Sequence, residues 1–138
     1  MKLVVSLAAL GAVAAVAVTG ESPAPARQQV QTEVVSVRCP AGNVPASVSP
    51  EEVRVRVGNS VEWRVIGPTA SDSIWIDLKA PQQQAWPFAG APPRGGSSAR
   101  ANGARNPGTY SYNVHLLCRV PGGGIEPVTI DPDIIVEE

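Results

Sequence analysis

The sequence predicts an all-β domain: a Greek-key antiparallel β-sandwich of about six or seven strands, with one long loop rich in proline and glycine. Two observations carry this prediction. First, β-branched residues recur at every second position in several short segments, as on strands with one buried face. Second, the 138 residues include 14 prolines and 13 glycines, which leave few uninterrupted stretches for a helix after residue 20.

Residues 1–20 have the order of a secretory signal peptide: one lysine, an apolar run over residues 3–18, then small residues. The run is shorter than the roughly 20 residues that cross a bilayer, and no basic residue follows it directly, so we favour a cleaved signal over a retained anchor. Cleavage fits after Gly20 or after Ala26. The mature protein is therefore expected to be secreted or periplasmic, with no stable membrane insertion after cleavage.

The mature chain is nearly neutral. Removing residues 1–20 takes one of the 11 basic residues and none of the 12 acidic ones, which leaves a net charge of −2. A charge this small gives no support to nucleic-acid binding. Residues 21–29 are rich in proline and small polar residues and are expected to form a mobile tether. Residues 30–138 then form one domain.

The first strands are expected in residues 30–39 and in the segment VRVRVGNSVEWRV, residues 53–65. The second segment predicts two half-buried strands joined by residues 58–60. This connection is either a hairpin or an arch that crosses between two sheets. In both cases one set of side chains faces the interior: Val53, Val55, Val57, Val61, Trp63 and Val65.

Three further strands are expected in SIWIDLK, TYSYNVHLL and EPVTIDPDIIVEE, the last of them interrupted at Pro132. In the first, Ile74, Ile76 and Leu78 alternate with polar residues and Trp75. Between the first two, residues 79–108 hold five prolines and five glycines. Missing backbone donors and high backbone entropy predict that this segment is mostly irregular.

Two motifs resemble those of the cupredoxins, the family of small blue copper proteins. One is V-x-V-x-x-G-x-x-V-x-W over residues 53–63, and the other is G-T-Y-S-Y over residues 108–112. Their order and separation are similar to those of the family across residues 48–136. The resemblance implies a Greek-key sandwich and, in members that bind copper, a thiolate and two imidazoles around the metal.

The copper ligands that the resemblance implies are missing from this sequence. The cysteine position of the second motif falls on Val114, and its histidine position falls on Leu117. Residues 68–73, where the upstream histidine is expected, contain none, and the single methionine is Met1. The sequence therefore predicts no cofactor and no type 1 copper site.

The two cysteines, Cys39 and Cys118, end the first strand and the long late strand. In an exported domain this arrangement predicts a disulfide bond between them. With Trp63 between them, an immunoglobulin-type sandwich is the rival fold, but its tyrosine corner would need a tyrosine at Leu116. The cupredoxin-like sandwich is therefore preferred.

His115 is the one histidine of the chain, and strand alternation points it to solvent or to a sheet rim. A surface histidine is the favoured interpretation. A metal site with Cys118 or Asp77 is the weaker one, because two ligands do not close a site. One histidine and two bonded cysteines also leave no Ser–His or Cys–His pair, so we do not expect an enzyme.

The predicted loop at residues 79–108 is the candidate partner-binding segment. It is basic, because no acidic residue lies between Asp77 and Glu126, and it also carries aromatic side chains. Trp and Arg commonly anchor protein contacts, so the loop is suited to a protein or an anionic component of the cell envelope. In the alternative, its aromatic residues cap the sandwich and its arginines stay solvated. The candidate residues are Trp86, Phe88, Arg94, Arg100 and Arg105.

Together these observations predict a small exported cupredoxin-like domain without a type 1 copper site. We expect it to act as a binding or structural module of the cell envelope or extracellular space. The alternative is a metal-binding or redox protein that handles copper or electrons through His115 and its cysteines. The identity of the partner and the oligomeric state do not follow from the sequence.

Overall fold

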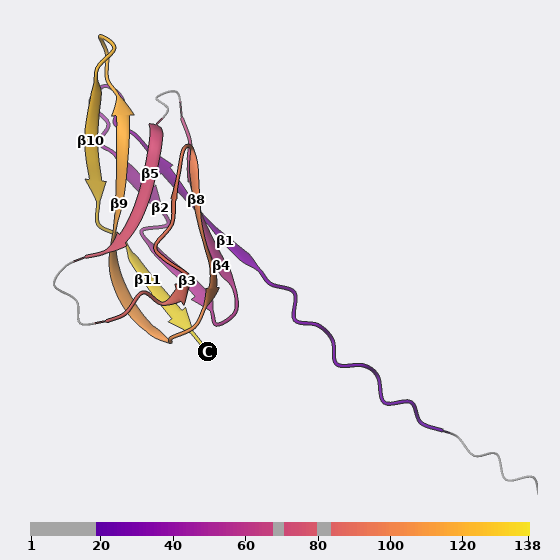
Figure 1. Cartoon of the computed structure of the whole chain (residues 1–138). Coiled ribbons are helices and arrows are strands. Elements are labelled where there is room, and N and C mark those ends of the chain that lie inside the picture. The colour runs from indigo at the N-terminus through magenta and orange to yellow at the C-terminus, as the bar shows by residue number, and fades with distance from the viewer. Residues whose placement is uncertain (1–18, 68–70, 80–83) are drawn as a thin grey trace, which may run out of the picture.

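The computed structural model describes residues 19–67, 71–79 and 84–138. The predicted signal peptide falls almost wholly outside these residues. Over the described residues the chain forms eleven strands and no helix, and hence no helix long and apolar enough to span a membrane. The strands build two sheets that pack face to face (Figure 1). The all-β sandwich predicted from the sequence is confirmed.

The first sheet has five strands in the order β2-β1-β4-β8-β6. Strand β1 runs parallel to β4, whereas the other neighbours are antiparallel. The strands are β1 (Thr32–Arg38), β2 (Ser47–Ser49), β4 (Ser60–Val65), β6 (Phe88–Ala89) and β8 (Ser98–Ala104).

The second sheet has six strands. Five follow the order β3-β11-β9-β5-β7, and β10 pairs with the other half of the long strand β9. Strands β3 and β11 are parallel. Both sheets are therefore mixed, not purely antiparallel as predicted, because each parallel pair joins strands separated by a crossing to the opposite sheet. The strands are β3 (Glu52–Arg56), β5 (Ser71–Leu78), β7 (Arg94–Gly95), β9 (Gly108–Arg119), β10 (Ile125–Ile130) and β11 (Asp133–Glu137).

The connection between β3 and β4 is an arch, because β3 belongs to the second sheet and β4 to the first. Gly58, at φ 89°, supplies the left-handed backbone that the turn requires. Val53 and Val55 point into the core as predicted. Val57 does not: β3 ends at Arg56, and the valine lies exposed in the arch. The predicted burial of Val57 is therefore wrong.

The described residues of the segment expected to be irregular, residues 79 and 84–108, contain the three strands β6, β7 and β8. Strand β8 is a full member of the first sheet and pairs with β4 over four residues, Val61 to Arg64. Its buried side chains are small: Ala99, Ala101 and Ala104. Alanine gives little strand signal, which is why the segment resembled a loop. The prediction of irregular structure is therefore wrong for Ser98–Ala104, the residues of β8.

The G-T-Y-S-Y motif begins β9. Tyr110 donates its hydroxyl hydrogen to the backbone oxygen of Asn106 at 2.8 Å, which closes the turn before the strand. Gly108 has φ 151°, and a Cβ there would lie 3.4 Å from the Tyr110 ring. That distance is an ordinary van der Waals contact, so the positive φ, and not the tyrosine ring, is the reason for a glycine at this position. Tyr110 and Tyr112 are both buried, as strand alternation predicts.

Candidate functional site

The outer face of the second sheet carries a row of four side chains, one from each of four neighbouring strands. Trp75 of β5 is paired with Arg94 of β7 on one side and with His115 of β9 on the other, and His115 is paired with Thr129 of β10. Residues paired in this way share one face of a sheet. Their neighbours along the strands, such as Ile74 and Leu116, are fully buried, so the row faces outward. We call Arg94, Trp75, His115 and Thr129 the outer row.

The imidazole of His115 is held from three sides. The Trp75 indole stacks on it, with ring centroids 5.0 Å apart and an interplanar angle of 15°. Its Nε2 lies 3.0 Å from Asp77 Oδ1, and its Nδ1 lies 3.0 Å from Thr129 Oγ1. The side chain keeps 20% of its surface exposed. The ring is therefore fixed in place but can still be reached from solvent.

Asp77 is itself held in place. Asn113 lies opposite it on β9 and donates from Nδ2 to the same Oδ1 at 3.0 Å. A carboxylate accepts but does not donate, so Nε2 of His115 carries a hydrogen. The hydroxyl of Thr129 can both donate and accept, so it pairs with Nδ1 whether or not that nitrogen carries a hydrogen. The resulting order, carboxylate, imidazole, hydroxyl, is the order of an acyl-transfer relay. Here, however, it lies on the open face of a sheet.

The structure places the predicted metal ligands as follows. His115 meets Asp77, one of the two partners considered, but not Cys118, which is bonded to Cys39. Val114 is fully buried in the core, and Leu117 lies on the outer face beside β10. Within the described part of the chain, no three His, Cys, Asp or Glu side chains come together to hold a metal ion. The His115–Asp77 pair supplies two donors only.

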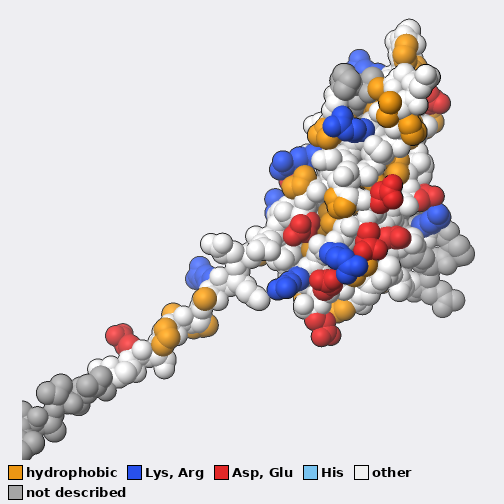
Figure 2. Space-filling model, turned by 180° about the vertical axis from the view of Figure 1, so that it is seen from behind, with side chains coloured by type: hydrophobic (Ala, Val, Ile, Leu, Met, Phe, Trp, Pro, Cys, Tyr) orange, Lys and Arg blue, Asp and Glu red, His pale blue; other side chains and the backbone are white. Residues whose placement is uncertain are grey.

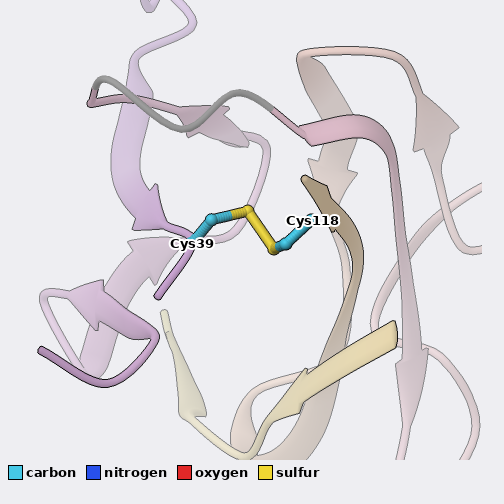
Figure 3. The surroundings of a disulfide bond; sticks show 2 residues. All are labelled: Cys39 and Cys118. Carbon is cyan, nitrogen blue, oxygen red and sulfur yellow. A yellow bond between two sulfur atoms is a disulfide. The ribbon is translucent and has the colours of Figure 1, made fainter. Parts of the chain in front are cut away.

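The predicted disulfide is present. Cys39 follows β1 in the first sheet, Cys118 lies near the end of β9 in the second, and their sulfur atoms are 2.02 Å apart (Figure 3). Both residues are buried. The bond therefore ties the two sheets together at one end of the sandwich, and it leaves neither cysteine of the chain as a thiolate.

The aromatic residues of the predicted binding loop pack against the sandwich. Phe88 is only 4% exposed and belongs to the core. Trp86 is half-buried against it, with ring centroids 5.3 Å apart. The backbone oxygen of the intervening Pro87 accepts from Arg105 N at 2.7 Å, which fixes the segment to the end of β8. These contacts match the capping alternative for the two aromatic side chains.

The arginines of the same segment do not form one patch. Arg94 lies in the outer row of the second sheet. Arg100 lies on the first sheet, opposite Glu62, and donates to Thr32 Oγ1 at 2.9 Å. Arg105 is exposed after the end of β8. On the face of the molecule turned away in Figure 1, basic and acidic side chains are mixed over the lower part of the sandwich, and further basic side chains follow its upper left side (Figure 2).

The outer row was only partly visible in the sequence. Alternation along β5 and β9 places Trp75 and Asp77 on one face of their strand and Asn113 and His115 on one face of theirs. The register of β5 and β9 sets Trp75 against His115, which follows it by 40 positions (115 − 75), and the pairing of β10 with β9 adds Thr129. The signal available in the sequence was Trp75, a large aromatic residue on the outward face of a strand between the buried Ile74 and Ile76.

The strand order, with β2 in the first sheet, β3 in the second and two parallel pairs, is consistent with a cupredoxin-like β-sandwich. No family model and no curated protein matches the chain. A solved structure of an amicyanin mutant in its reduced Cu(I) form is similar over 81% of this chain and 88% of that chain, with 17% sequence identity and a TM-score of 0.42. At that level the likeness carries no argument about function.

Proposed function

We propose that the protein is a small exported binding module of the cell envelope or extracellular space, without a type 1 copper site, and that the outer row is its recognition face. The observation that carries the proposal is the fixed imidazole of His115 on a solvent-facing sheet, stacked on Trp75. Export is supported by the order of residues 1–20 and by the disulfide bond, which persists in oxidising compartments.

The chemistry of the outer row suits recognition. Tryptophan and arginine are enriched among residues that dominate binding energy, and Trp75 and Arg94 lie side by side. The contacts of His115 with Asp77 and Thr129 are made before any partner arrives. Little side-chain entropy is therefore lost on binding. Arg94 suits a partner with an anionic group, which keeps the proposed partner a protein or an anionic envelope component.

The test is capture of partners from an envelope extract by immobilised mature protein. Trp75→Ala should lower the amount captured about tenfold or more, while the melting temperature falls little because Trp75 lies outside the core. Arg94→Ala should lower the amount captured, and it should also make capture less sensitive to salt concentration. The control is Arg56→Ala, an exposed arginine of β3 on another part of the second sheet. Capture unchanged in Trp75→Ala would reject the outer row as the recognition face.

A metal-binding function remains the second candidate, because one observation favours it: His115 Nε2 and Asp77 Oδ1 lie only 3.0 Å apart at the surface. A divalent ion could replace the proton between them. The disulfide removes the cysteine thiolates that the redox form of this alternative requires. Titration of the mature protein with Zn²⁺, compared with His115→Ala, separates this candidate from the binding module.

A further inference from the structure

An open sheet edge presents backbone N–H and C=O groups that can pair with another chain, and most edges of this sandwich carry a feature that discourages pairing. Strands β6 and β7 have two residues each, and β2 has three and is followed by Pro50. Strand β3 turns three charged side chains to solvent: Glu52, Arg54 and Arg56.

The edge strand β10 carries a proline, Pro127, at a position where it hinders pairing with a further strand on the open side. Val120 N donates to Gly124 O at 2.9 Å across the β9–β10 turn. Alternation from this pair turns the backbone groups of Glu126 and Val128 toward β9 and those of Pro127 toward the open side. The missing N–H of the proline therefore lies on the outer edge, where it weakens pairing with a further strand.

The first half of β1 has no such feature. Strand β4 pairs with β1 from Thr32 to Val37, but β2 covers only Ser36 to Arg38 on the other side. Among the residues that the structure describes, residues 32–35 therefore have a strand neighbour on one side only. The segment from residue 28 to residue 38 contains neither proline nor glycine. Figure 1 shows the preceding stretch leaving the sandwich from the start of β1 and running away from its body.

The backbone of this half-strand is oriented for pairing. Gln31 O accepts from Ser60 N at 2.9 Å, and Val37 O accepts from Ile66 N at 2.8 Å. Odd-numbered residues of β1 thus turn their backbone groups to β4. Thr32 and Val34 turn theirs to the uncovered side, and the same alternation extends to Val30.

The side chains on this edge are apolar and exposed. Val30 is 65% exposed and Val34 is 41% exposed. Val34 lies on the outer face of the first sheet, two residues after Thr32, where β1 begins. If the alternation of β1 is continued two residues before Thr32, Val30 falls on the same face. A strand that places an apolar side chain opposite each valine would bury both.

We propose that this edge is a homodimer interface, in which the β1 strands of two copies pair antiparallel about a two-fold axis at Thr32. Val30 of each copy then lies opposite the partner's Val34, and the backbone groups of residues 30, 32 and 34 gain partners. Glu33 lies opposite the partner's Gln31, so no like charges face each other. The two five-stranded sheets join into one continuous sheet.

The strand that pairs with this edge comes from a second copy because the segment is complementary to itself, which a two-fold interface requires. Neighbouring registers fit less well. An axis at Val34 sets Thr32 against the partner's Ser36, whose place is already taken by Ser49 of β2. An axis at Glu33 sets the two carboxylates against each other and leaves Val30 unpaired.

The test is sedimentation velocity on purified protein, produced from the whole sequence, over a series of concentrations. We expect a reversible monomer–dimer equilibrium in the micromolar range, as for a small interface made mostly of backbone hydrogen bonds. Val34→Lys should weaken dimerisation about tenfold or more. Val44→Lys is the matched control: Val44 is 64% exposed in the β1–β2 connection, away from the edge, and its substitution should leave the equilibrium unchanged.

Two further variants test the register. Thr32→Pro removes an outward N–H that takes no part in the ladder with β4. It should therefore abolish the dimer and leave the circular dichroism spectrum of the folded domain unchanged. Thr32→Cys should form a disulfide between copies on oxidation, whereas Val44→Cys should not. Wild-type protein that stays monomeric, an effect of Val44→Lys equal to that of Val34→Lys, or no cross-link through Thr32→Cys would overturn the proposal.

Discussion

Trp63 Nε1 donates a hydrogen bond to Tyr112 Oη at 2.9 Å in the middle of the core. The two rings meet edge to face, with centroids 5.6 Å apart and an interplanar angle of 65°. Trp63 belongs to β4 of the first sheet and Tyr112 to β9 of the second, and both are fully buried. A buried indole N–H needs an acceptor, so this bond helps to fix how the two sheets face each other.

Tyr112→Phe should therefore destabilise the domain by about 1–3 kcal/mol, because it keeps the ring but leaves the Trp63 N–H buried without an acceptor. Urea unfolding followed by tryptophan fluorescence measures the change in the free energy of unfolding. Tyr110→Phe is the matched control, since the acceptor it releases, Asn106 O, lies in a surface turn that water reaches. Equal losses in the two variants would contradict this account of the core bond.

The same pair predicts a dependence on alkaline pH. Burial raises the pKa of Tyr112 well above its ordinary value, while the hydrogen bond from Trp63 lowers it less. The folded state thus holds this proton more tightly than the unfolded state, whose tyrosines titrate near pH 10. The contribution is fully present below about pH 10 and is lost as the pH rises further. The stability gap between wild type and Tyr112→Phe should shrink above pH 10; a constant gap would contradict the assignment.

Much of the fold could be predicted because large apolar residues mark the inward positions of most strands. Val53, Val55, Trp63 and Tyr112 alternate with polar residues, and all are buried in the structure. Alternation of this kind directly reports which face of a strand leaves water. The cysteine pair could be predicted for a different reason, since only two cysteines are present in a chain expected to be exported.

The remaining features depend on register and on small residues. Strand β8 buries alanines, whose hydrophobic signal is weak, so the segment around Ala99 and Ala101 resembled a loop. The contact between His115 and Asp77 depends on how β5 and β9 align, which turn lengths and long-range packing decide. For the same reason, Arg94 and Arg100 looked like neighbours in the sequence but lie on different sheets.

The disulfide should contribute strongly to stability. Its closed loop spans a sequence separation of 79 residues. The chain-entropy model converts a loop of about this length to roughly 4.5 kcal/mol, as an upper value. The double variant Cys39→Ala and Cys118→Ala should lose up to this amount in urea unfolding. In the wild type, alkylation without reductant should leave the intact mass unchanged, and two adducts on most molecules would contradict the bond.

Copper should not form a blue centre in this protein. Val114 fills the core where the resemblance expects a thiolate, and Leu117 provides no imidazole. Mature protein mixed with Cu(II) should show no intense visible charge-transfer band, and its affinity should match that of a surface histidine. His115→Ala is the control and should remove what weak binding there is. A stoichiometric blue complex that survives dialysis against a weak chelator would show that the second motif is aligned wrongly.

The aromatic pair of residues 86 and 88 should act mainly through stability. Phe88→Ala removes a ring that is almost fully buried and should cost about 3–5 kcal/mol, with Trp86→Ala costing less because that side chain is only half-buried. Trp86 Nε1 is buried and has no acceptor within the described part of the chain. Trp86→Phe should therefore be close to neutral, because it keeps the packing against Phe88 and removes an unsatisfied donor. Thermal melts of the three variants, measured beside capture of envelope partners, separate packing from recognition. A Trp86→Ala variant with an unchanged melting temperature and about tenfold weaker capture would restore this tryptophan as a binding residue.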